Sequence, residues 1–285
     1  MIFFRMRAAG TAAFAAAVML GVAATAQAAG GFQVQASANV SGSDFDQLNG
    51  VADTGFFDVA VGSYRISGQT LFHALALRFN GRTWSPVTVP APAGDNTSLQ
   101  AVTTVTPADN WAVGSDATHS LIEQQNNSSS WSLVASPANE PANSVLEAVS
   151  AASAGDVWAV GDSRAGTVGQ GFEPLIEHWN GTAWSVVPSP SVTASGVQDF
   201  LGGVSEIGSS DVWAVGFTSN LGTDQTLAEH WDGTSWQIVP SANPGPSASA
   251  LNSVAQTAPG GPLRAVGFST GGTPATATLI ETTVG

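Results

Sequence analysis

Three acidic residues have the chemistry that hydrolysis of a glycosidic bond requires, although they lie far apart in the sequence. They are Asp46, Glu147 and Asp199. A glycosidase uses two carboxyl groups, one as an acid and the other as a base or nucleophile. Only a fold that brings distant segments to one place could make a catalytic group of these residues.

A second set of polar residues has the composition of a binding site for a neutral ligand or a cation. The set combines amides, carboxylates, one tyrosine and two arginines. Its members are Asn49, Gln100, Glu147, Asn252, Tyr64, Arg65, Asp162, Arg164 and Asp224. The alternative interpretation is a ring of solvated loop side chains that bind nothing.

Other patterns that carry chemistry are missing from the sequence. It has no HExxH motif, no metal-spaced cluster of histidines and no nucleophile elbow, so we expect neither a metal nor a cofactor. His178 and His230 share one repeat position and fit half-buried places on strands. Four glutamates share another repeat position, where a structural hydrogen-bond acceptor is expected. These are Glu123, Glu177, Glu229 and Glu281.

Short β-type runs with a period of about 50 residues must position these side chains. Asp156–Gly161 and Asp211–Gly216 both read DVWAVG, and looser copies end at Gly62, Gly114 and Gly267. An Asn-Gly or Asp-Gly pair shortly before a tryptophan predicts a tight hairpin in most repeats. Such a repeat indicates the blades of a propeller.

The sequence therefore predicts an all-β fold, a five-bladed β-propeller of four-stranded antiparallel blades. The blades are expected at residues 48–90, 99–137, 146–190, 201–242 and 251–285, with 32–38 completing the last. The last repeat lacks a fourth strand, and Phe32–Asn39 matches Trp236–Asn243 in register. We expect Phe32–Ala36 to close the ring, which would leave no open sheet edge. The tryptophans occupy repeat positions and are expected to pack blade against blade.

The N-terminus has the features of a signal peptide. Arg5 and Arg7 precede the alanine-rich run Ala8–Ala24, and Ala26–Ala28 supplies a small-x-small cleavage pattern. We expect residues 1–29 to be removed and 30–285 to form a single secreted propeller domain without stable membrane insertion. A retained N-terminal anchor is the alternative.

Charge and cysteine content exclude several classes of partner. The chain has 7 basic and 21 acidic residues, and its net charge of −14 becomes −16 when Arg5 and Arg7 are removed. Such a field repels phosphate backbones and anionic lipids, so nucleic acid is an unsuitable partner. Without cysteine there are no disulfides. We expect a monomer stabilised by its core.

A strand that ends in glycine, followed by a loop and an aromatic–turn–Trp hairpin, resembles a kelch repeat over Phe32–Gly285. The form DVWAVG…HWNGTxW is similar to that of secreted actinobacterial β-propeller proteins described as kelch-like or galactose-oxidase-like. The chain departs from kelch repeats because no second glycine follows the first. The copper site of galactose oxidase needs a tyrosine cross-linked to cysteine, and here Tyr64 is the single tyrosine and cysteine is absent.

These observations favour a binding or interaction module for glycan or protein at or outside the cell surface. The repeat is regular and the loops are polar, and no catalytic motif is present. The alternative is a glycoside hydrolase with Asp46, Glu147 and Asp199 drawn from different blades at the channel mouth.

Overall fold

The computed structural model describes residues 35–55, 57–90, 92, 96–106, 108–126, 130–164, 171–191, 197–220, 222–272 and 275–283. Strands, turns and irregular segments account for all of these residues, and none of them is helical. Accordingly, this part of the chain contains no apolar helix long enough to cross a bilayer. Ala36–Gly285 forms one compact unit, to which the fold below belongs.

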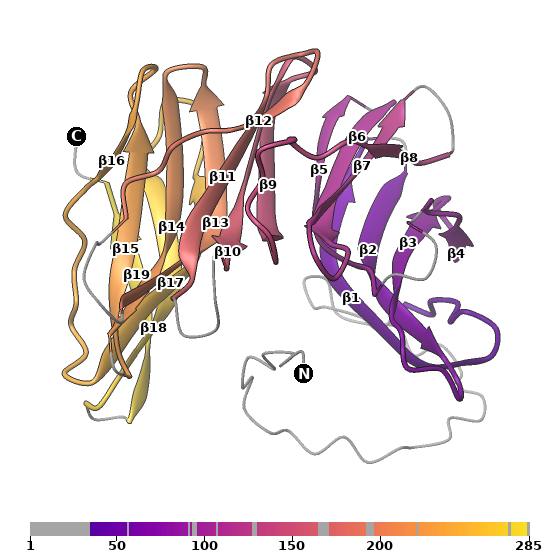
Figure 1. Cartoon of the computed structure of the whole chain (residues 1–285), viewed down its shortest axis with the longest axis horizontal. Helices are drawn as coiled ribbons and strands as arrows, with labels where there is room; N and C mark the ends of the chain where they lie inside the picture. Colours follow the sequence, from indigo (N-terminus) through magenta and orange to yellow (C-terminus); the bar gives the residue numbers. More distant parts are fainter. Residues whose placement is uncertain are drawn as a thin grey trace, which may run out of the picture. The chain divides into compact units, whose positions relative to one another are not determined.

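The strands form antiparallel sheets in which each strand pairs with the next along the chain (Figure 1). The first sheet consists of β1 (Ser43–Asp53), β2 (Asp58–Ile66), β3 (His73–Phe79) and β4 (Trp84–Val87). The second consists of β5 (Ser98–Thr106), β6 (Asp109–Ser115), β7 (Ser120–Asn126) and β8 (Ser132–Val134). The third consists of β9 (Val145–Ser153), β10 (Asp156–Ser163), β11 (Glu173–Trp179) and β12 (Trp184–Val186).

The last sheet joins two such units through one parallel pair, Asp224 with Ala248. The fourth unit consists of β13 (Val197–Gly208), β14 (Asp211–Asn220), β15 (Thr223–Trp231) and β16 (Trp236–Ile238). The fifth consists of β17 (Ala248–Gln256), β18 (Leu263–Thr270) and β19 (Thr276–Thr282). The predicted all-β fold of four-stranded antiparallel sheets is confirmed. Most of the predicted closing strand Phe32–Ala36 lies outside the described residues, so the closed five-bladed ring stays a prediction.

One glycine in the second strand of each unit permits very close contact with the first strand. A Cβ atom added there would lie 1.8–1.9 Å from a carbonyl oxygen of the first strand. These glycines are Gly62, Gly114, Gly161, Gly216 and Gly267. Opposite each of them the first strand contains a β-bulge after its leucine. The repeated glycine therefore reflects steric exclusion of any side chain.

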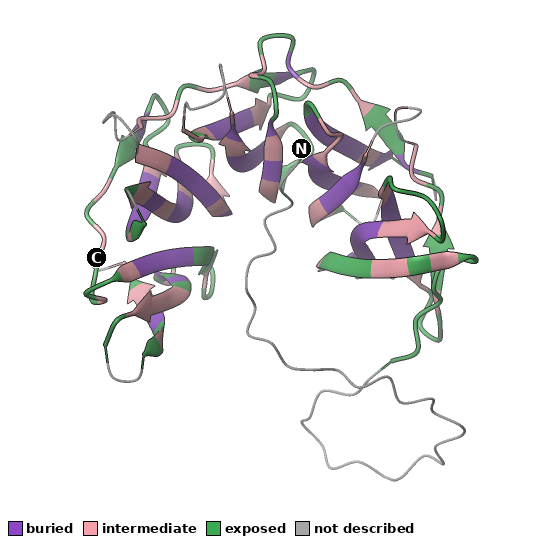
Figure 2. Ribbon diagram, turned by 60° about the horizontal axis from the view of Figure 1, so that its bottom comes forward, coloured by how far each residue is buried: buried purple, intermediate pink, exposed green. Residues whose placement is uncertain are grey.

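The hydrophobic core consists of four clusters, each between two consecutive units. Figure 2 shows buried positions along the strands and exposed positions mainly in turns and outer segments. Trp158 of β10 contacts Trp231 and Trp236 of the fourth unit, with ring centroids 5.1 and 5.4 Å apart. The same arrangement is formed by Trp111, Trp179 and Trp184. The predicted packing of tryptophans between blades is confirmed for these six residues.

Glutamates at one repeat position also join consecutive units. Ser189, after β12, donates a hydrogen bond of 2.8 Å to Glu229 on β15. Ser241, after β16, donates one of 2.7 Å to Glu281 on β19. The predicted structural role of the repeated glutamates is thereby confirmed at these two positions.

The glutamates at the same repeat position in the second and third units, Glu123 and Glu177, have poorer hydrogen bonding or none. Glu177 accepts a hydrogen bond of 3.4 Å from Ser120, and burial, followed by the charge of Glu140, raises its pKa to about 8. Both carboxyl oxygens of Glu123 are buried without a hydrogen-bond partner, and burial raises its pKa to about 8. At the repeat position that Ser189 and Ser241 hold in later units, the first unit has Val89, which cannot donate a hydrogen bond to Glu123. Burial therefore favours the neutral form of Glu123 and Glu177 in the folded protein.

Candidate functional site

In the first strand of every unit, the β-bulge leaves one residue outside the ladder of backbone pairs. These residues are Asn49, Gln100, Glu147, Gly202 and Asn252, and we call them the bulge row. All five are exposed or half-buried, and the first strands contact one another in the order β1, β5, β9, β13 and β17. The row therefore places amides and one carboxylate at equivalent points of consecutive strands. It includes four of the residues predicted to bind a ligand.

Asn49 has a structural partner as well as a place in the row. Its Nδ2 donates a hydrogen bond of 2.8 Å to the carbonyl of Leu99 on the next first strand. Its Oδ1 accepts one of 2.8 Å from Gln47. The Asn49 amide thus links β1 to β5.

Tyr64 and Arg65 lie near the end of β2, beside the start of β1. Tyr64 pairs with Asp46 in the ladder, and its ring centroid is 5.2 Å from that of His73. The Nε atom of Arg65 is 3.0 Å from Oδ1 of Asp44. The charge of this predicted ligand-binding arginine is therefore already balanced by a neighbouring carboxylate.

Asp162, Arg164 and Asp224 lie at the corresponding end of later units. Asp162 is half-buried in β10, and the Arg164 guanidinium lies 5.6 Å from the ring centroid of Phe172. Asp224 pairs with Ala248 where the fourth and fifth units meet. Asp162, Arg164 and Asp224 thus lie at the same end of their strands as Tyr64 and Arg65 do in the first unit.

The three acidic residues of the hydrolase alternative lie on different first strands. Asp46 accepts hydrogen bonds from Val40 N and from Ser43 Oγ, so its carboxylate holds the segment before β1. Glu147 lies on β9 and Asp199, which is 2 % exposed, on β13. Because β9 contacts β13, Glu147 and Asp199 are on neighbouring strands, whereas Asp46 on β1 is next to β5. No three His, Asp or Glu side chains of the described segments are grouped to hold a metal.

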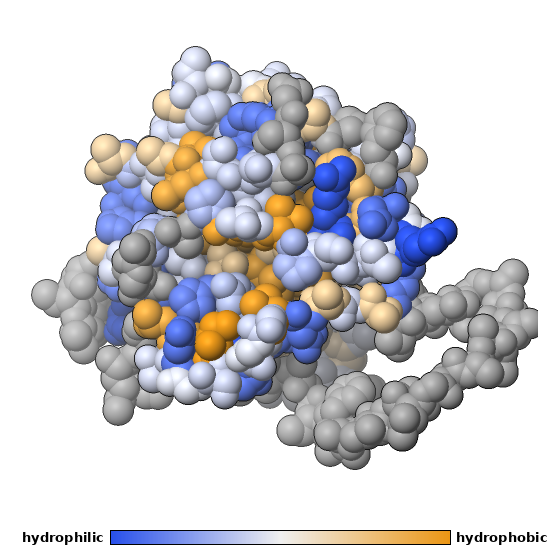
Figure 3. Space-filling model, turned by 90° about the vertical axis from the view of Figure 1, so that its right-hand side faces the viewer, coloured by the Kyte–Doolittle hydropathy of each residue, from blue (hydrophilic) through white to orange (hydrophobic). Residues whose placement is uncertain are grey.

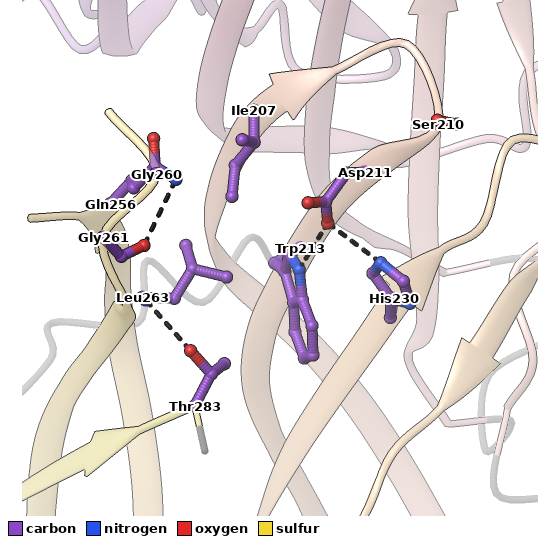
Figure 4. A pocket seen from close by; sticks show the side chains of 10 residues that line it. All are labelled: Ile207, Ser210, Asp211, Trp213, His230, Gln256, Gly260, Gly261, Leu263 and Thr283. Carbon is purple, nitrogen blue, oxygen red and sulfur yellow. Dashed lines mark hydrogen bonds and ion pairs between the residues drawn. The ribbon is translucent and has the colours of Figure 1, made fainter. Parts of the chain in front are cut away.

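A pocket of about 660 Å³ lies at the other end of the strands, between the fourth and fifth units (Figure 4). Oδ1 of Asp211 accepts hydrogen bonds from Trp213 Nε1 at 2.8 Å and from His230 Nε2 at 3.0 Å. These bonds fix the indole beside the cavity. The pocket is lined by Ile207, Ser210, Asp211, Trp213, His230, Gln256, Gly260, Gly261, Leu263 and Thr283.

The pocket occupies the space that two indoles fill between the third and fourth units. Trp213 is the repeat counterpart of Trp158, which is 1 % exposed because Trp231 and Trp236 cover it. In the fifth unit Thr283 stands at the position of Trp231, and no described residue stands at that of Trp236. Among its described residues, the fifth unit therefore supplies no indole beside Trp213. The sequence indicates this difference, because Thr283 stands where the third and fourth repeats have Trp179 and Trp231.

The histidines of the third strands bind aspartates, which sequence reasoning missed. His178 Nε2 lies 2.7 Å from Oδ1 of Asp156, an arrangement that His230 and Asp211 repeat. Each of these carboxylates reaches across the ladder to the third strand of its unit. Both histidines are half-buried on strands, as predicted.

Comparison with known proteins gives similarity in fold alone. No family model and no curated protein matches the chain. A structure of YCF48 bound to D1 peptide has a TM-score of 0.48 and 16 % identity, covering 81 % of this chain and 67 % of that one. The alpha-L-arabinanase of Penicillium chrysogenum, complexed with arabinobiose, has a TM-score of 0.49 and 11 % identity, covering 77 % and 76 %. These structural neighbours are β-propeller proteins.

Proposed function

We propose that the chain is an exported binding module that recognises glycan or protein at or outside the cell surface. The observation that carries this proposal is the bulge row, in which Gln100, Glu147 and Asn252 leave the ladder at equivalent points. A bulge leaves one residue unpaired in the ladder and can re-aim a side chain. A row of amides with one carboxylate suits the hydroxyl groups of a neutral saccharide or the backbone of a peptide.

The residues at the neighbouring strand ends would extend this surface. Tyr64 offers an aromatic ring and Asp224 a carboxylate, while Asp162 and Arg164 contribute charges of both signs. With a net charge of −14 for the whole chain, neutral and cationic ligands are favoured over anionic ones.

A glycan array and a pull-down from envelope fractions test the binding function. The purified chain should retain a ligand that the double variant Gln100→Ala, Glu147→Ala loses. Gln237→Ala is the matched control, since Gln237 is an exposed amide on outer strand β16. Equal retention by both variants, or no retention by the unmodified chain, would refute the proposal. Hydrolysis of arabinan, xylan or fructan that is abolished by Glu147→Gln would instead favour the glycosidase alternative.

We also propose that the fold is a five-bladed ring closed by Phe32–Ala36. Two features of the fifth unit support this proposal. Among the described strands, β19 pairs with β18 alone, whereas earlier third strands also pair with a fourth. The register predicted from the sequence would bring Phe32 to the position of Trp236, next to Trp213. If the Trp213 indole NMR signal is the same in the unmodified chain and in the Phe32→Ala variant, this result counts against the closure.

A further inference from the structure

The indole of Trp213 is less buried than the indoles of its repeat counterparts. Trp111 and Trp158 are 0 % and 1 % exposed, because two tryptophans of the following unit pack on each of them. Trp213 is half-buried and borders the pocket between the fourth and fifth units (Figure 4). The described part of the fifth unit places Thr283 where the fourth unit has Trp231. Its short side chain leaves part of the indole uncovered.

Apolar side chains also reach the surface elsewhere, and Figure 3 shows them on one face among polar ones. Exposed apolar residues that stand singly need no ligand to explain them. The surroundings of Trp213 differ because they enclose a hollow of about 660 Å³. That volume is within the range of about 300–1,000 Å³ that small-molecule sites occupy.

Two contacts hold the Trp213 indole without help from the fifth unit. The His230 ring lies beside it, with ring centroids 4.4 Å apart and planes inclined by 30°. Asp211 accepts a hydrogen bond of 2.8 Å from Trp213 Nε1. The Nε1 atoms of Trp111 and Trp158, by contrast, are buried without a hydrogen-bond partner. The aromatic surface at the pocket is thus fixed before any ligand arrives, which lowers the entropic cost of binding.

Polar groups surround this aromatic surface. The Asp211 side chain is 48 % exposed, so its carboxylate can accept further hydrogen bonds. Ser210 is exposed beside it, and the Gln256 amide of the fifth unit donates a hydrogen bond of 3.3 Å to the Gly261 carbonyl. Among the described residues that line the pocket, Asp211 is acidic and none is lysine or arginine. An anionic ligand is therefore disfavoured.

A flat apolar surface with hydrogen-bonding groups at its edge matches the ring of a neutral sugar. The C–H groups on one side of the sugar ring can lie on an indole, while its hydroxyl groups point outward to donate and accept hydrogen bonds. An aromatic side chain of a protein would fill the same space. It would offer no partner to Asp211 and Gln256, and their desolvation would oppose binding.

We propose that this pocket is a saccharide site, in which one neutral sugar ring stacks on Trp213 and its hydroxyl groups bond to Asp211 and Gln256. The site shares no residue with the bulge row. It therefore goes beyond the function proposed above and does not depend on it.

The saccharide site is compatible with the ring closure proposed above. Phe32 would take the position of Trp236, which is one of the two indoles that pack on Trp158. The other is Trp231, and its counterpart Thr283 belongs to the described structure. Closure thus supplies one of the two rings, and the space of the second remains for a ligand.

Indole N–H NMR signals measure binding at this site, with the Trp213 signal assigned from the Trp213→Phe variant. The probes are arabinotetraose, xylotetraose, mannotetraose and cellotetraose, each titrated to millimolar concentration. At least one should shift the Trp213 signal saturably, and the shift should persist in Gln100→Ala, Glu147→Ala, which alters the bulge row. Absence of a saturable shift with all four would overturn the proposal. An equal shift with N-acetyltryptophanamide would overturn it in favour of an aromatic side chain of a protein partner.

Filling the pocket tests the same site by substitution. Thr283→Trp introduces the tryptophan of the earlier repeats and should abolish the sugar-induced shift without lowering the Tm. Thr276→Trp is the matched control and should keep the shift, because Thr276 is exposed on the same strand and does not line the pocket. Asp211→Asn should weaken binding about tenfold, since hydrogen bonds to a charged group are lost. Undiminished binding by either Thr283→Trp or Asp211→Asn would overturn the proposal.

Discussion

Ser189 donates a hydrogen bond of 2.8 Å to the buried carboxyl of Glu229, which lies 40 residues further along the chain on the next unit. The bond lowers the pKa of Glu229, but burial outweighs it and raises that pKa to about 7. A serine that follows the last strand of one sheet therefore donates a hydrogen bond to a buried glutamate of the next sheet. This pairing joins consecutive units by a polar contact within their hydrophobic interface.

Removing that serine should weaken the contact. Ser189→Ala leaves a buried oxygen of Glu229 without its donor, which costs about 1–3 kcal/mol of unfolding free energy. Urea unfolding measures the loss, and the pKa of Glu229 should rise further because a bond that favours its charged form is gone. Ser132→Ala is the control, since Ser132 is exposed on β8. An equal loss in both variants would contradict the role assigned to Ser189.

Introducing a serine at the same repeat position of the first unit should stabilise the fold instead. Val89→Ser places a hydroxyl at the repeat position that serves the next glutamate, which here is Glu123. Because both Glu123 oxygens lack a partner, a new hydrogen bond should lower its pKa from about 8. A gain of up to about 1 kcal/mol is expected if the bond outweighs the lost burial of valine. Carboxyl NMR titration decides, and an unchanged Glu123 pKa would show that no bond forms.

The protein should be more stable in mild acid than in mild alkali. Burial raises the pKa of Glu123, Glu177 and Glu206 to about 8 and that of Glu229 to about 7. Each folded pKa exceeds the ordinary glutamate pKa of 4.5, so the folded state holds more protons than the unfolded chain between those values, and stability falls as pH rises through them. Tm should decline from pH 5 to pH 8.5, by about 2–4 °C for each kcal/mol lost. A flat or rising profile would falsify this assignment.

Glu206 offers a matched control for the pH dependence. Its Oε2 accepts a hydrogen bond of 2.9 Å from Ala152 N, and burial and then the charge of Asp156 raise its pKa. In the next unit Gln256 holds the equivalent position and lines the pocket with Asp211. Glu206→Gln should therefore flatten part of the decline between pH 4.5 and pH 8. An identical slope would mean that other carboxyls account for all of it.

The sequence predicts those parts of the fold that depend on local spacing. Repeated hairpins and tryptophans indicated the strands and the packing of Trp158 on its neighbours, since period and residue type determine both. The partner of Asp156 was missed because His178 lies on the next strand, beyond a variable loop. The exposure of Val51 and Ile280 also depends on which sheets touch, which local spacing does not determine.

The repeated glycine gives the sharpest stability prediction. A Cβ atom on Gly161 would lie 1.9 Å from the carbonyl oxygen of Val145, which belongs to the paired backbone and cannot turn aside. Gly161→Ala should therefore destabilise the chain at or above the usual overpacking range of about 1–3 kcal/mol. A Cβ on Gly208 would meet nothing within 4 Å, so Gly208→Ala should change stability by no more than about 0.5 kcal/mol. Urea unfolding of the two variants separates steric exclusion from the general cost of replacing glycine in a strand. Equal losses would mean that the close approach of β9 to β10 relaxes at little cost.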